Sequence, residues 1–60
     1  MAPAYRVTLC NRDGDVKADT TLPFVPFVGL QIVPPWSTEY MEAQEVLWDT
    51  EAGAFEVYLD

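Results

Sequence analysis

The strongest constraint on the fold of this chain is the alternation of apolar and polar residues near its C-terminus. Two β-prone runs, 46–49 and 54–59, are separated by the four-residue loop Thr50-Glu51-Ala52-Gly53. The glycine that ends this loop suits a left-handed backbone conformation, which is typical of β-hairpin connections. The pattern therefore predicts an antiparallel hairpin over the last fifteen residues.

The register of this hairpin follows from the pairing that best separates apolar from polar side chains. If Asp49 faces Ala54, one face of the hairpin carries five apolar residues and one glutamine. Its predicted pairs are Trp48 with Phe55, Val46 with Val57, and Gln44 with Leu59. A shift by one residue would place Trp48 against Glu56 and lose this separation.

The other face of the predicted hairpin is mostly acidic. Its predicted pairs are Leu47 with Glu56, Glu45 with Tyr58, and Ala43 with Asp60. Apolar anchors within a polar rim are typical of protein–protein interfaces. The alternative is a solvated face that only keeps the protein in solution. The candidate protein-binding residues are Glu45, Leu47, Asp49, Glu51, Glu56, Tyr58 and Asp60.

Three upstream segments add further strand and turn signals. Residues 5–10 alternate and predict a half-buried strand, which ends at a turn over 11–15 that contains Asp-Gly. Residues 16–21 predict a short edge strand or a loop. The apolar run from Leu22 contains Pro23 and Pro26, which exclude a central strand, so we expect an extended loop packed by Phe24 and Phe27, followed by a strand over 28–33.

The segment 36–48 allows two interpretations. The first is a helix, because the apolar residues fall on one side of a helical wheel and Ser37 suits the N-cap position. Glu39, however, falls inside the apolar arc. The hairpin pattern favours a strand over 43–49, preceded at most by a helical turn near 37–42. Trp36, which follows Pro34 and Pro35, is expected to act as a lid on the core, with an exposed binding anchor as the alternative.

The predicted strands define the fold class. Sixty residues offer room for a single domain over 1–60, and four or five short strands cannot form two well-populated sheets. We therefore expect an all-β fold in which a small antiparallel sheet curls into an SH3-like or OB-like barrel.

Charge is distributed unevenly along the chain. Residues 31–60 hold seven acids and no base, whereas residues 1–30 hold three of each. An acidic surface repels phosphate backbones and anionic lipid, and three cations supply little of the counterion release that drives nucleic-acid binding. Direct binding to nucleic acid or to a membrane is therefore disfavoured.

The residue inventory offers little catalytic or metal-binding chemistry. Histidine is absent and Cys10 is the only cysteine, so general-base, zinc-finger and disulfide patterns do not occur. The oxygen ligands in 11–19 lack the glycine position and the distal glutamate of an EF-hand, which favours a hairpin turn. A chain this small also rarely offers a substrate pocket. We expect no enzyme activity, no cofactor and no metal.

The expected compartment is the cytoplasm. A lone cysteine suits a reducing environment. The N-terminal stretch Met1-Ala2-Pro3-Ala4-Tyr5-Arg6 has no leader pattern, and no apolar run approaches the length needed to span a bilayer.

The order of proline, glycine and apolar positions covers most of the chain. It comprises Leu22-Pro23, Pro26, Gly29-Leu30-Gln31-Ile32, Tyr40, Val46-Leu47-Trp48-Asp49 and Phe55-Glu56-Val57-Tyr58-Leu59. This order resembles that of short uncharacterised bacterial and phage proteins that look like small SH3-like β-barrels. The resemblance implies the barrel fold and assigns no functional residue.

Together these observations favour a small acidic protein-binding module, encoded by a phage or another mobile element, that docks on a basic surface of a larger protein. In its strong form it would mimic the charge of DNA and act as an inhibitor. The alternative is an assembly module that forms a homodimer or packs into a larger complex, because an apolar loop and a small core leave surface to cover.

Overall fold

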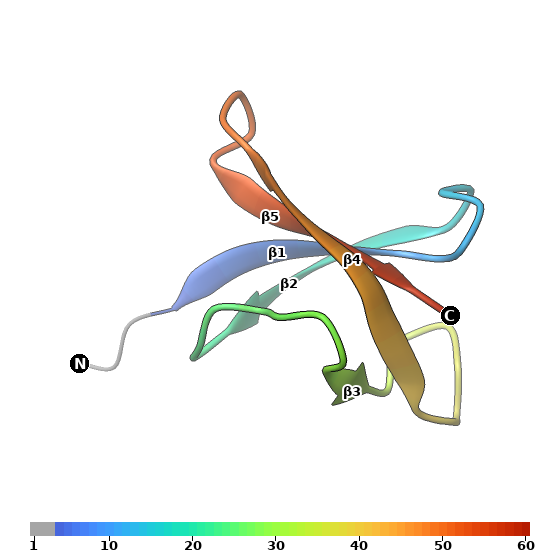
Figure 1. Ribbon diagram of the computed structural model, residues 1–60. Helices are drawn as coiled ribbons and strands as arrows, with labels where there is room; N and C mark the ends of the chain where they lie inside the picture. The colour runs from blue at the N-terminus through green and yellow to red at the C-terminus, as the bar shows by residue number, and fades with distance from the viewer. Residues whose placement is uncertain (1–3) are drawn as a thin grey trace.

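The computed structural model describes residues 4–60, which form one curled five-stranded sheet and no helix (Figure 1). The strands are β1 (Tyr5–Cys10), β2 (Lys17–Leu22), β3 (Gln31–Ile32), β4 (Met41–Asp49) and β5 (Ala54–Leu59). Their order in the sheet is β2-β1-β5-β4-β3, which makes a half-barrel with β2 and β3 at its edges. The all-β, small-barrel fold class is confirmed. Met1, Ala2 and Pro3, and the prediction that rests on them, lie outside the described residues. Within 4–60 there is no helix that could cross a membrane.

The centre of the sheet is a parallel pair, so the expectation of a wholly antiparallel sheet is wrong there. Strand β1 pairs with β5 in parallel, with Val7 beside Phe55 and Leu9 beside Val57, whereas the other three strand pairs are antiparallel. Periodicity within one strand predicts which face a residue takes but not which distant strand lies beside it. The two β-hairpins therefore meet through strands that are far apart in sequence (Figure 1).

The β1–β2 hairpin forms around the predicted Asp-Gly turn. Gly14 has a φ of 79°, and its N–H donates to the Asn11 carbonyl at 3.1 Å. The Asn11 N–H donates to the Val16 carbonyl at 3.0 Å, and the Asn11 side-chain oxygen accepts from the Val16 N–H at 3.2 Å. The oxygen-rich segment thus serves a turn, and β2 follows it as an edge strand.

The β4–β5 hairpin has the predicted register from Glu45 to Asp49, where Trp48 faces Phe55 and Val46 faces Val57. The prediction is wrong further down β4. A bulge at Gln44 places Ala43, and not Gln44, opposite Leu59. The reason is packing, because the one-residue insertion turns Ala43 into the core and leaves Gln44 exposed.

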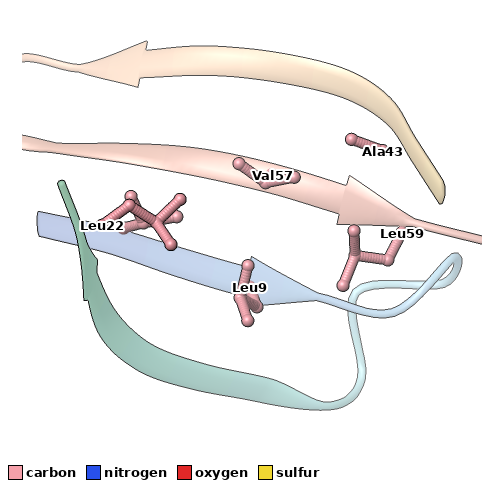
Figure 2. Close-up of a cluster of buried hydrophobic side chains, with 6 residues drawn as sticks. Leu9, Leu22, Ala43, Val57 and Leu59 are labelled. Atoms are coloured by element: carbon pink, nitrogen blue, oxygen red, sulfur yellow. The ribbon is translucent and has the colours of Figure 1, made fainter. Parts of the chain in front are cut away.

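The core lies on the concave face of the curled sheet (Figure 2). Side chains from β1, β2, β4 and β5 meet there, and half-buried apolar residues from the 23–40 segment pack against them. Trp36 is one of these, so its expected role as a lid is confirmed. The buried cluster comprises Val7, Leu9, Leu22, Ala43, Val57 and Leu59.

The segment that joins β2 to β4 differs from the prediction in three respects. Only Gln31–Ile32 forms a strand within 28–33, because Gly29 adopts a φ of 97° in a turn closed by the Leu30 N–H and the Phe27 carbonyl. The helical turn near 37–42 is absent. The Ser37 hydroxyl accepts from the Glu39 N–H instead, and β4 begins at Met41.

Packing in the apolar loop also differs from the expectation. Phe24 and Phe27 contact each other, with ring centroids 6.3 Å apart, but both side chains remain exposed. Pro26 and Pro34 are the buried residues of this segment. The rigid prolines therefore anchor the loop while the phenylalanines face outward.

Candidate functional site

The outer face of the β4–β5 hairpin, opposite the core, holds the predicted binding residues. Glu45 and Leu47 lie on β4, directly opposite Tyr58 and Glu56 on β5. Asp49 ends β4, Glu51 lies in the loop, and Asp60 follows β5. We call this set the acidic face, which comprises Glu45, Leu47, Asp49, Glu51, Glu56, Tyr58 and Asp60.

The two cross-strand pairs at the middle of the acidic face alternate in character. Leu47 is 43% exposed and faces the half-buried Glu56, while the exposed Glu45 faces the half-buried Tyr58. Directly opposed side chains in an antiparallel pair have Cβ atoms about 5 Å apart. Each apolar group is therefore within reach of a carboxylate, as the sequence predicted.

Tyr58 is positioned by the β1–β2 hairpin. It lies beside Cys10 across the parallel pair, and a Cβ atom placed on Gly14 would be 3.8 Å from a ring carbon of Tyr58. The ring thus rests against the turn between β1 and β2. This contact fixes the ring at one end of the acidic face, and it joins two segments that no local pattern links.

The bulge brings a further acid to this end of the hairpin. Glu42 and Asp60 face each other and exchange two backbone hydrogen bonds, of 3.1 and 3.0 Å. The Gln44 side-chain amide donates to the Glu42 carboxylate at 3.2 Å. Two exposed carboxylates directly opposite each other repel, and a cation bound nearby reduces that repulsion. Sequence reasoning missed Glu42 because it did not predict the bulge.

An open depression of about 370 Å³ lies at the same end of the acidic face. Three predicted residues contribute to it, together with Arg12 from the β1–β2 turn, which sequence reasoning missed. The lining residues are Arg12, Gln44, Glu45, Tyr58, Leu59 and Asp60.

Asp49 is used within the hairpin loop. Its Oδ1 atom accepts hydrogen bonds from the N–H groups of Glu51 at 3.0 Å and Ala52 at 3.2 Å, and its carbonyl accepts from Gly53 at 2.9 Å. Gly53 has a φ of 64°, as the loop pattern predicted. The Asp49 carboxylate therefore holds the loop that separates the two acidic strands.

Cys10 is fully buried beneath the outer face of the sheet. Burial raises the pKa of its thiol, the nearby Glu56 raises it further, and Lys17 opposes them with a smaller effect. A raised pKa keeps the thiol protonated and poorly nucleophilic. The side chain therefore fills space in the folded sheet, where both burial and protonation disfavour attack by its sulfur.

We expect Cys10 in the native protein to react with Ellman's reagent at least about tenfold more slowly than in urea, because reaction requires opening of the sheet. The stopped-flow or manual absorbance time course measures this rate.

The thiol also makes the stability depend on pH. Because its pKa is higher in the folded than in the unfolded state, its contribution to the free energy of unfolding is complete below the unfolded pKa of about 8.5 and is lost as the pH rises through the folded pKa. Cys10→Ala should remove this pH dependence of the free energy of unfolding. Equal rates of reaction with Ellman's reagent in the native and the urea-unfolded protein would contradict the burial of the thiol.

The concave side of the same hairpin carries an aromatic cluster whose exposure was not predicted. Trp48 packs edge-on against Phe55 at 4.8 Å, and Phe55 packs against Tyr5 at 6.3 Å. Trp48 is nevertheless 55% exposed, although its register assigned it to the core face. Alternation predicts the face of the strand, but it does not predict whether another segment covers the side chain.

The comparisons with known proteins add no relative: no protein-family model, curated protein or solved structure matches this chain.

Proposed function

We propose that this chain is a non-enzymatic protein-binding module that docks its acidic face on a basic surface of a larger protein. The observation that carries the proposal is the register of the β4–β5 hairpin, which places Glu45 and Glu56 around Leu47 and Tyr58. An apolar centre within a charged rim combines contact area with steering by charge. The excess of acids in residues 31–60 gives this surface a single sign.

The depression at the end of the acidic face supports a more specific contact. Two acidic residues, Glu45 and Asp60, line it together with Tyr58. A lysine or arginine side chain is the group that such a lining complements, through ion pairing and through contact with the aromatic face. Arg12 also lines the depression, and its positive charge reduces the number of further cations that can bind there.

The test is capture of partners by the wild type and by Glu45→Lys/Glu56→Lys. We expect the reversed variant to lose the captured protein, because the rim charge that steers the contact changes sign. Retention on the wild-type resin should also fall steeply with added salt. Quantitative mass spectrometry of matched pull-downs measures both effects.

The matched control is Asp13→Lys/Glu39→Lys, which makes the same change in net charge at exposed positions outside the acidic face. Capture should survive in this control. Equal capture by the wild type and by Glu45→Lys/Glu56→Lys would reject the proposal, and equal loss in both variants would show that net charge alone acts. If the captured protein binds nucleic acid, competition by duplex DNA tests the strong form, in which the acidic face mimics DNA.

A further inference from the structure

Strand β2 presents a free edge on the side of the sheet away from the acidic face. It pairs only with β1 among the described residues, and it is six residues long. The hydrogen bond from the Asn11 N–H to the Val16 carbonyl sets the phase of the antiparallel ladder. By alternation, the backbone N–H and C=O groups of Lys17, Asp19 and Thr21 point away from β1. Such an edge is a template for an added strand.

We propose that this edge pairs with the same edge of a second copy of the chain, antiparallel about a two-fold axis through Ala18. Each Lys17 then faces the partner's Asp19, while Ala18 faces its own copy and Val16 faces the partner's Thr20. In this register the backbone N–H and C=O groups that point outward from the two edges also face each other. The result is a ten-stranded sheet with self-complementary charge at its centre.

The charges of β2 select this register over its neighbours. An axis through Asp19 would oppose two carboxylates, and an axis through Lys17 would oppose two ammonium groups. An axis through Thr20 would pair Asp19 with Thr21 and form no ion pair. Both Lys17 and Asp19 are exposed, so their side chains are accessible to the partner.

The distribution of charge over the whole sheet favours β2 over the other exposed edge. The other exposed edge is the part of β4 that β3 does not cover. From Glu45 to Asp49 it holds acidic residues and no cation, so two copies of this edge would repel each other. The half of the chain that holds β2 has three acids and three bases. Because β4 lies three positions from β2 in the sheet order, the dimer keeps the two acidic faces apart.

Sedimentation equilibrium of the full chain tests this proposal. The edge contact is small, so we expect a monomer–dimer equilibrium with a Kd on the order of 100 μM. Lys17→Asp and Asp19→Lys should each weaken self-association about tenfold, because each variant opposes like charges twice. An equimolar mixture of the two variants should form a heterodimer with wild-type affinity, since both opposed pairs then have opposite signs.

Several results would overturn the proposal. A wild type that stays monomeric up to about 1 mM removes the dimer. Variants that dimerise as the wild type does place the contact elsewhere, such as at the exposed Phe24 and Phe27, and a mixture that fails to associate rejects the register. Asp19→Lys also removes the 3.0 Å hydrogen bond from the Thr8 hydroxyl, so circular dichroism must show that each variant is folded.

The dimer and the proposed function are separable. The variant Glu45→Lys/Glu56→Lys should dimerise as the wild type does, because it leaves β2 unchanged. Asp13→Lys is the matched charge control for Asp19→Lys, and it should also retain the wild-type Kd.

Discussion

Leu59→Ala is expected to lower the free energy of unfolding by about 3 kcal/mol, because it removes a fully buried side chain from the core. Proteins gain roughly 0.05–0.15 kcal/mol of stability per residue, so a chain of 60 residues has about 3–9 kcal/mol in total. The substitution therefore removes a large part of the stability. Urea unfolding followed by far-UV circular dichroism measures the change.

Leu47→Ala is the matched control, since it deletes the same atoms from the same hairpin but on the exposed face. Leu47 is 43% exposed, whereas Leu59 is fully buried. We expect a loss of about 0.5 kcal/mol for Leu47→Ala, typical of surface substitutions. Equal losses for the two leucines would show that the concave face is not the core.

Asp49→Ala is expected to cost about 1–2 kcal/mol of stability, because it removes the acceptor for two loop N–H groups. Glu51→Ala, which removes a neighbouring exposed carboxylate, should cost little. Thermal unfolding of the two variants at one pH separates them. The comparison also assigns a role, because a variant of Asp49 that keeps full stability but loses partner capture would make Asp49 a binding residue instead.

Local patterns were sufficient for the hairpins. The alternation in 5–10 and 54–59 and the glycines at positions 14 and 53 predicted two strands and two turns at the positions where the structure has them. They also predicted the pairing of Trp48 with Phe55 and of Leu47 with Glu56. These features depend on residues close in sequence, where one register separates apolar from polar side chains and the others do not.

The candidate site was predicted only in part. Glu45, Leu47, Glu56 and Tyr58 share one face as expected, because that face follows from the hairpin register. The depression does not follow from it. Arg12 reaches the depression from another hairpin, and Gln44, which also lines it, is the residue at which the bulge shifts the ladder.

The sequence by itself determined the all-β class, the turns and the acidic character of one hairpin face, since each depends on alternation or on the backbone freedom of a glycine. Only the tertiary structure decided that β1 lies parallel to β5, that Ala43 is buried and that Trp48 is exposed. The physical reason is that alternation sorts side chains between two faces of a strand. Burial on either face depends on which distant segment covers it, and that is settled by the packing of the whole sheet.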